Sequence, residues 1–296
     1  MFTRNATARE VLLSGASLNP EDRAVKEENF FSRIPLQNGH FKMTSANRLD
    51  DVIEIIVRHI RGRWSDEILR VLDVGVSSGI TTIELAEALR RSGRLFKIVG
   101  TDLCIEASLL SYGRHLHVLC DRQGQALQFE LLGFPVSNYL GTGFWSWLRR
   151  IVPVLFARVL FGLLAFPPIR RLIGPPLVRP VRLLTGRWQD DPDVEFVQED
   201  LFGEITNGSQ YHFIRAANIL NRRIFSTAQL RRAIGLLRAR LRTGGSLLIL
   251  RTHEDRSNHG ALYDLQNDGS FRRVVSFGEG CEVEPVLLAI EREVII

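Results

Sequence analysis

Cysteine is scarce in this sequence, and the few cysteines lie far apart. The 296 residues include three, Cys104, Cys120 and Cys281. No two of them form a C-x-x-C pair. We therefore expect no disulfide framework and no metal site, and the reducing cytoplasm is the expected compartment.

The sequence also lacks a long apolar run. Near the N-terminus no basic segment is followed by an apolar stretch, so we expect no signal peptide. The longest apolar run covers about sixteen residues between positions 151 and 166, which is short of the roughly twenty that span a bilayer, and it contains Arg158. A transmembrane helix is therefore not predicted.

The overall composition is that of a globular protein. Hydrophobic residues make up 45% of the chain and charged residues 24%, which is enough apolar material for a sizeable core. The formal net charge of +5 is a mild excess that comes from arginine rather than lysine. No basic motif is interleaved with aromatic residues, so nucleic acid is not the partner that we expect.

The most informative stretch is Arg70–Thr82, with the sequence RVLDVGVSSGITT. Residues 71–74 predict a buried strand, residues 75–79 a turn of small residues, and the apolar spacing that follows predicts a helix. Small residues let the backbone approach a ligand, and a helix N-terminus offers unpaired N–H groups. A second short strand begins at Lys97 and ends on Asp102, where a carboxylate that binds a ribose hydroxyl is expected.

This turn resembles motif I of the class I S-adenosylmethionine (SAM)-dependent methyltransferases, an acidic residue followed by three alternating glycines. Here the motif is Asp73, Gly75, Ser77 and Gly79, and it departs from the family at Ser77, where glycine is usual. The resemblance implies SAM as the cofactor. It also implies that Asp73 faces the methionine part, that Gly75–Gly79 border the cofactor backbone, that Asp102 binds the ribose hydroxyls and that Asp200 binds the adenine amine.

The resemblance covers about residues 45–105 and 190–296. We expect an α/β fold with a Rossmann-like sheet, mostly parallel with an antiparallel C-terminal strand, and helices on both faces. The first further element is a helix with Ser45 as its N-cap, an apolar stripe from Leu49 to Ile60 and an end near Gly62. The other predicted elements are a strand that ends at Asp200, a strand that begins at Tyr211, a helix over 227–241, a strand over 246–250 and antiparallel strands over 271–277 and 282–290.

The predicted domain organisation has an arm, a cofactor domain and an insertion. Residues 1–44 show no sustained periodicity and are expected to form an irregular arm or lid. Residues 45–296 form the SAM-binding domain, interrupted by an insertion at about 106–190 that starts with a predicted hairpin around Asp121–Gly124. Residues 140–175 are apolar and flanked by arginines, which suits a helical cap, a dimer contact or a helix on a membrane surface.

Methyl transfer requires a general base only where the acceptor must lose a proton. His253 and Glu254, which follow the strand over 246–250, are the candidate bases, and Asn218 is the candidate orienting group. The apolar insertion favours a hydrophobic small molecule or a lipid as the methyl acceptor.

The competing hypothesis is a non-catalytic protein that keeps this fold for binding or scaffolding. Ser77 and Arg215, an arginine inside a predicted strand, favour it. An NAD(P)-dependent enzyme is disfavoured because G-x-G-x-x-G is absent, and acyl hydrolysis is disfavoured because the turn is not a G-x-S-x-G elbow.

Overall fold

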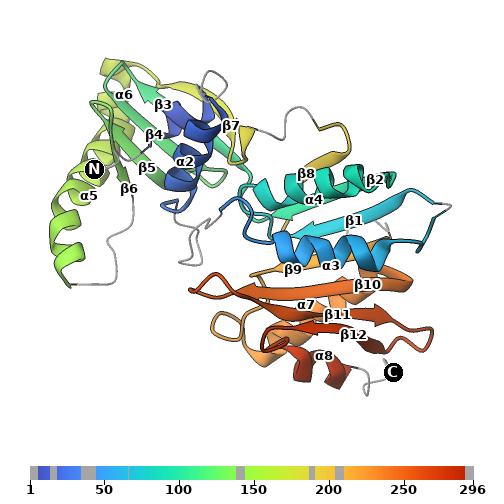
Figure 1. Cartoon of the computed structure of the whole chain (residues 1–296). Coiled ribbons are helices and arrows are strands. Elements are labelled where there is room, and N and C mark those ends of the chain that lie inside the picture. Colours follow the sequence, from blue (N-terminus) through green and yellow to red (C-terminus); the bar gives the residue numbers. More distant parts are fainter. Residues whose placement is uncertain are drawn as a thin grey trace. The chain divides into compact units, whose positions relative to one another are not determined.

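The computed structural model describes residues 6–13, 19–34, 45–65, 67–137, 144–186, 191–203 and 210–290. The chain divides into two compact units (Figure 1). One, here called the core unit, comprises Ser45–Leu103 and Arg187–Ile296. The other, here called the insert unit, comprises Met1–Thr44 and Cys104–Gly186, so the N-terminal segment and the insertion belong to the same unit.

The core unit is built on a seven-stranded sheet with the order β12-β11-β10-β9-β1-β2-β8. β1 pairs in parallel with β2 and β9, β2 with β8, and β9 with β10, whereas β11 and β12 run antiparallel. This confirms the expected fold class. The strands are β1 (Leu69–Val74), β2 (Phe96–Asp102), β8 (Val194–Gln198), β9 (Tyr211–Ala217), β10 (Leu241–Thr252), β11 (Asn258–Leu265) and β12 (Phe271–Phe277).

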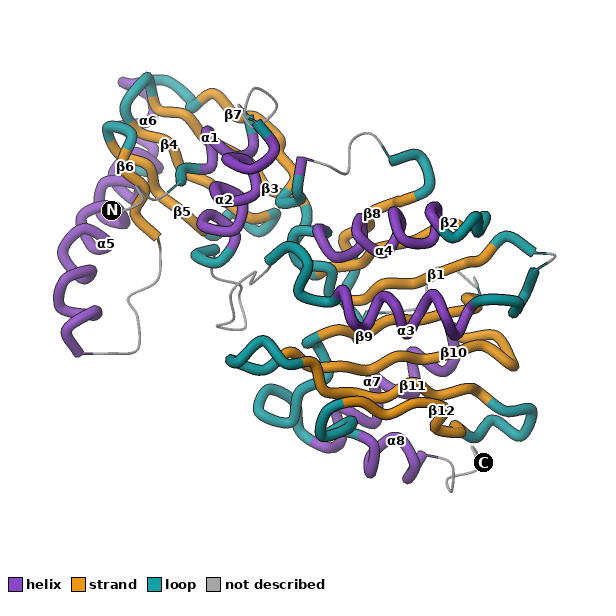
Figure 2. The backbone as a smooth tube through the Cα atoms, in the orientation of Figure 1, coloured by secondary structure: helices purple, strands orange, loops and turns teal. Residues whose placement is uncertain are grey.

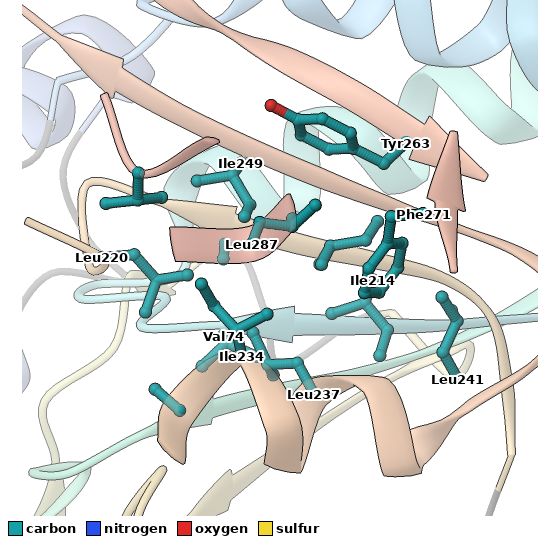
Figure 3. Close-up of a cluster of buried hydrophobic side chains, with 14 of the residues drawn as sticks. Val74, Ile214, Leu220, Ile234, Leu237, Leu241, Ile249, Tyr263, Phe271 and Leu287 are labelled. Atoms are coloured by element: carbon teal, nitrogen blue, oxygen red, sulfur yellow. The ribbon is translucent and has the colours of Figure 1, made fainter. Parts of the chain in front are cut away.

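Helices cover both faces of this sheet (Figure 2). On one face, Val74 and Ile214 pack with Ile234 of α7 (Thr227–Arg240) and Leu287 of α8 (Glu284–Ile290), as Figure 3 shows. Asp73 and Arg215 alternate with these apolar positions and point to the opposite face, which carries α3 (Asp50–Ile60) and α4 (Ile80–Arg91). The polar pair is therefore enclosed between the sheet and a helix.

One predicted strand is wrong. In place of the strand predicted over 282–290, residues 284–290 form α8, and the antiparallel partner of β12 is β11. Val283, Val286 and Leu287 are buried together, and their spacing of three and four residues is that of a helix face. β11 was not predicted because it begins with the polar residues Asn258 and His259, although most of its side chains are buried.

The insert unit contains a five-stranded antiparallel sheet with the order β6-β5-β4-β3-β7. The predicted hairpin is confirmed, because β4 pairs with β5 and the turn is closed by a bond from Gly124 N–H to the Asp121 carbonyl. The strands are β3 (Glu106–Tyr112), β4 (Leu116–Asp121), β5 (Ala126–Leu131), β6 (Phe134–Ser137) and β7 (Leu177–Arg182).

The N-terminal segment is more regular than expected. It contains α1 (Ala8–Leu12), which starts with a capping box between Thr7 and Glu10, and α2 (Pro20–Phe31), capped by Asn19. Residues of these helices pack on one face of the insert sheet, together with Leu109 of β3 and Leu119 of β4. Residues 35–44 lie outside the described residues, and the role of residues 1–44 as a lid stays a prediction.

The apolar part of the insertion forms α5 (Phe144–Ala165), which is followed by α6 (Pro167–Ile173). Ala157 of α5 packs with Leu116, Val118 and Phe129, so α5 covers the face of the insert sheet opposite α1 and α2. Within the described ranges, no helix combines the length and the apolar character that crossing a membrane requires.

Candidate functional site

The candidate site lies at the carboxyl edge of the core sheet, where β1 turns into α4. Gly75, Ser77 and Gly79 all have positive φ angles, of 73°, 57° and 78°. The turn is held to the neighbouring strand because the N–H groups of Gly75 and Val76 both donate to the carbonyl of Thr101. α4 begins after Gly79, which has no side chain that could cap the first turn of the helix.

Asp102 ends β2 directly beside this turn. Its Oδ2 accepts a hydrogen bond of 2.8 Å from the backbone N–H of Ser77, and the residue is 8% exposed. The structure therefore brings the two predicted signals of the sequence, the turn and the carboxylate, into direct contact.

The two glycines of the turn lie close to other side chains of the core unit. A Cβ at Gly75 would lie 2.8 Å from Ile219, and a Cβ at Gly79 would lie 2.7 Å from the ring of Phe196. Phe196 belongs to β8 and also packs against Gly100 of β2. Both glycines have positive φ, so any other residue would be strained at either position.

Asp73, the acidic residue of the motif, is engaged inside the protein. Its Oδ1 accepts from Nε of Arg215 at 2.8 Å and its Oδ2 from Nη2 at 2.5 Å. The Oδ2 atom also accepts a bond of 2.6 Å from the hydroxyl of Thr82. Arg215 is fully buried and Asp73 is 1% exposed, so this is a desolvated, bidentate ion pair.

A second arginine lies close to this pair. Burial lowers the pKa of Arg48, and the neighbouring Arg215 lowers it further, whereas Asp73 and Glu84 oppose the shift. Glu84 in turn accepts a bond from the N–H of Asn47, which holds the segment before α3 against α4. The space between the sheet and these helices thus holds two cations and two carboxylates, which balances the charge.

Asp200 follows β8 and is exposed. Its Oδ1 accepts the N–H of Phe202 at 2.9 Å, and its carbonyl accepts the N–H of Gly203. The carboxylate therefore caps a turn, and its binding of an adenine amine stays a prediction.

Asn218 follows β9 with a φ of 62° and joins the ends of two strands. Its Oδ1 accepts the N–H of Thr252 at 2.6 Å, and its Nδ2 donates to the hydroxyl of the same residue. Thr252 then donates to Asn258, whose Nδ2 donates to Asp51 and to the carbonyl of Arg48. This side chain has a structural task, and a role in orienting an acceptor stays a prediction.

His253 and Glu254 lie in the exposed turn between β10 and β11. The ring of His253 stacks on that of His259, with centroids 4.0 Å apart and planes 15° apart. The Nδ1 atom of His259 accepts the N–H of Glu279, and its Nε2 lies 2.6 Å from the hydroxyl of Ser257. The role of either predicted residue as a base stays a prediction.

These histidines and Glu279 also place three potential metal ligands within 4.8 Å of one another. Histidine binds a metal through a nitrogen lone pair that lies in the ring plane. Because the two rings are stacked nearly parallel, their lone pairs do not converge on one point, and both nitrogens of His259 have hydrogen-bond partners. As arranged here, the group is a stacked pair rather than a formed metal site.

Sequence reasoning missed the partners that hold this site together. The residues concerned are Arg48, Thr82, Phe196, Thr252, Asn258 and His259. Arg215 itself was the one signal in the sequence that pointed to such a partner, because an arginine inside an apolar strand needs a buried carboxylate.

The site residues suit a nucleoside-type cofactor in two respects. Asp102 presents a carboxylate at the end of β2, and the first turn of α4 presents N–H groups without a side-chain cap. Both oxygens of Asp73 accept hydrogen bonds within the protein, from Arg215 and Thr82.

No protein-family model matches the sequence, and no curated protein matches it. The solved structures to which the chain is similar include the CMeT domain of the citrinin polyketide synthase, with 15% identity over 70% of this chain and 35% of that one and a TM-score of 0.36. The N-methyltransferase NodS from Bradyrhizobium japonicum, in complex with S-adenosyl-L-homocysteine (SAH), matches with 10% identity over 75% of this chain and 71% of that one, at a TM-score of 0.35.

Magnesium protoporphyrin IX methyltransferase from Synechocystis, with bound SAH, matches with 12% identity over 69% of this chain and 55% of that one, at a TM-score of 0.32. The chain spans 35% to 51% of the length of the first three matching structures. These likenesses are remote, so the fold class rests on the strand order and pairing of the core sheet.

Proposed function

We propose that the protein is a SAM-dependent methyltransferase whose cofactor binds at the carboxyl edge of the core sheet. The observation that carries this proposal is the hydrogen bond between Ser77 and Asp102, which joins the glycine-rich turn to the carboxylate at the end of β2. In an open α/β sheet, ligands bind at the carboxyl ends of the strands, beside such a turn.

In this proposal Gly75, Ser77 and Gly79 border the cofactor, Asp102 binds the ribose hydroxyls and Asp200 binds the adenine amine. Asp73 holds the turn through Thr82 and Arg215 rather than by direct contact with the ligand. The cofactor's sulfonium supplies an electrophilic methyl group. An acceptor atom forms a bond to that carbon as the carbon–sulfur bond breaks, and correct alignment of the two contributes much of the rate.

For the acceptor, we propose a hydrophobic small molecule or a lipid, which the apolar surface of α5 in the same chain supports. If the acceptor loses a proton, His253 or Glu254 would take it, with Asn218 orienting the group. All three follow β9 or β10, whose carboxyl ends lie at the same edge of the sheet as the turn.

The second candidate is a non-catalytic protein that uses the fold for binding or as a scaffold. Two observations favour it. The carboxylate of Asp73 forms a bidentate ion pair with Arg215, and the candidate bases His253 and Glu254 are exposed in a turn. This candidate predicts that methyl transfer does not occur even where the cofactor binds.

The experiment is thermal unfolding with SAM, SAH or NADH, applied to the wild type and Asp102→Asn. A ligand at about a hundred times its Kd adds roughly 2.7 kcal/mol, and each kcal/mol raises Tm by about 2–4 °C in a domain of 150–250 residues. We expect SAM and SAH to raise the Tm of the wild type, NADH to have no effect, and Asp102→Asn to abolish the shift.

The matched control is Asp121→Asn. Asp121 also ends a strand, is 4% exposed and accepts a backbone N–H at 2.8 Å, but it belongs to the insert unit. This variant should keep the full shift. No shift with any ligand would contradict the proposal. A shift without SAH formation, when the protein is supplied with SAM and an organic extract of cells, would favour the scaffold.

A further inference from the structure

The helix α5 has two apolar faces, of which only one is covered. On the covered face, Val154 and Ala157 are buried, and Phe161 makes edge contacts with Tyr112 and Phe129 at centroid distances of 6.4 and 5.9 Å. These contacts attach α5 to the insert sheet and fix which side of the helix points outward.

The outward side carries a continuous apolar stripe, here called the α5 stripe. Its members are 50% to 70% exposed, and their spacing of one, three or four residues places them along one side of a helix. The α5 stripe consists of Val152, Leu155, Phe156, Val159, Leu163 and, just beyond the helix, Phe166. Single exposed apolar residues need no explanation, whereas a contiguous set of six marks an interaction surface.

The charged residues of the segment that carries the α5 stripe are all basic. Between Glu130 and Asp190 the sequence contains no aspartate and no glutamate. It does contain arginines, and among those whose side chains the structure describes, Arg158, Arg170, Arg171 and Arg179 are exposed. The arginines of this segment are Arg149, Arg150, Arg158, Arg170, Arg171, Arg179, Arg182 and Arg187. The partner of this surface must therefore accept apolar side chains and supply negative charge.

A bilayer that contains anionic lipids meets both requirements. An amphipathic helix lies in the membrane interface with its apolar face at the acyl boundary, and nearby arginines bind lipid phosphates. A second copy of this chain meets only one of them. A symmetric contact through the α5 stripe would bring two arginine-rich segments together, and neither segment has an acidic residue to pair with the other.

We propose that the insert unit docks on the surface of anionic membranes, with the α5 stripe at the lipid boundary and Arg170 and Arg171 on lipid phosphates. The proposal does not depend on cofactor binding by the core unit. In this arrangement α5 lies in the plane of the membrane. Two observations agree with it: the exposed apolar residues of α5 lie along one side of the helix, and no helix among the described residues could span a membrane.

The experiment is vesicle co-sedimentation of the full chain, with phosphatidylcholine alone or mixed with anionic phosphatidylglycerol. We expect strong partition only onto the anionic vesicles, weakened by added salt because exposed charges are screened. Val159→Glu should lower the partition coefficient about tenfold or more, because it places a charge in the apolar boundary. Val25→Glu is its matched control, since Val25 lies on α2 of the same unit and is 53% exposed, against 59% for Val159.

A second pair of variants tests the electrostatic part. Arg170→Gln with Arg171→Gln should weaken partition about tenfold or more, whereas Arg222→Gln with Arg223→Gln, an exposed adjacent pair in the core unit, should leave it unchanged. Circular dichroism of each variant confirms that it is folded.

Three results would overturn the proposal. The first is equal partition onto neutral and anionic vesicles, and the second is equal loss in Val159→Glu and Val25→Glu. The third is a dimer of the wild type in analytical ultracentrifugation that Val159→Glu dissociates while vesicle partition stays unchanged, because the α5 stripe would then bind a second copy.

Discussion

The guanidinium of Arg215 and the carboxylate of Asp73 form a bidentate ion pair between adjacent parallel strands. The two residues stand opposite each other in the register of β1 and β9, and both are almost completely buried. The Nη2 atom of Arg215 also donates to the hydroxyl of Thr81, while Nη1 is buried and has no hydrogen-bond partner among the described residues. The acidic residue at the start of the glycine-rich turn is therefore held by the sheet itself.

Removing one partner of this pair should destabilise the protein strongly, because the other charge is left buried and unpaired. Arg215→Met and Asp73→Leu should each lower the free energy of unfolding by about 3–5 kcal/mol. The double variant should lose less than the sum of the two, since it leaves no unpaired charge. Urea unfolding of the four proteins measures this coupling.

The control is the exposed pair of Arg122 and Glu106, separated by 3.7 Å, with side chains 68% and 60% exposed. Arg122→Met should change stability by at most about 1 kcal/mol. Single variants of the buried pair that cost no more than this control would show that Asp73 and Arg215 do not stabilise the turn.

A Gly→Ala substitution should lower the free energy of unfolding at one position of the core unit and raise it at another. At Gly79 an alanine would have a positive φ and a Cβ 2.7 Å from Phe196, so we expect a loss of about 1–3 kcal/mol. At Gly235, inside α7, a Cβ would meet nothing within 4 Å, and helix propensity predicts a gain of about 0.5–1 kcal/mol. Chemical denaturation gives both values, and equal signs would contradict the packing described for the turn.

The sequence predicted the parts of the core unit that have a local signature. Periodic apolar residues and the glycine-rich turn were sufficient for β1, α3, α4 and α7. The turn and Asp102 could be placed together because the carboxyl ends of parallel strands share one edge of the sheet. The apolar pattern gave the wrong prediction for α8. The run from Glu282 to Ile290 is apolar enough for a strand or a helix, and its packing in the core determines that it is a helix.

The features that the sequence did not predict depend on contacts between residues far apart in the chain. The pairing of Asp73 with Arg215 joins residues 142 positions apart and requires the strand order β1-β9. Likewise, Arg9 of α1 bonds to Glu130 of β5 at 2.9 Å across 121 positions, so nothing local to residues 1–44 reveals that they belong with the insertion. Local patterns identify elements, but they do not tell which distant elements share a core.

The N-terminal segment and the insertion belong to one unit. A cavity in the core of that unit should therefore destabilise its own strands and not those of the core unit. Phe31 at the end of α2 is fully buried in the insert unit, and Phe31→Ala should cost about 3–5 kcal/mol. Hydrogen exchange should show protection lost in β3, β4 and β5 but kept in β1 and β2. The exposed Val25→Ala on the same helix should change neither. Loss of protection in β1 and β2 alone would contradict this grouping.

Acid should destabilise the core unit through His212, which lies at the start of β9. Burial lowers the pKa of His212, and the neighbouring Arg242 and Arg94 add to this effect, whereas Glu67 opposes it. Nδ1 accepts the backbone N–H of Arg70 at 3.0 Å, and Nε2 lies 3.1 Å from a carboxylate oxygen of Glu67 and 2.7 Å from Nη1 of Arg242. The folded state therefore holds the histidine neutral at a pH where the unfolded chain already binds a proton.

This difference in proton binding determines how the free energy of unfolding changes with pH. Below the unfolded pKa of about 6.5, the unfolded state binds more protons than the folded state, so the free energy of unfolding falls as pH falls. Above that value both states are neutral and this contribution is constant. His212→Gln, which cannot titrate, should therefore show a smaller loss of stability between pH 7.5 and pH 5.5 than the wild type, measured by urea unfolding at each pH. An equal or larger loss in the variant would show that His212 does not cause the acid sensitivity.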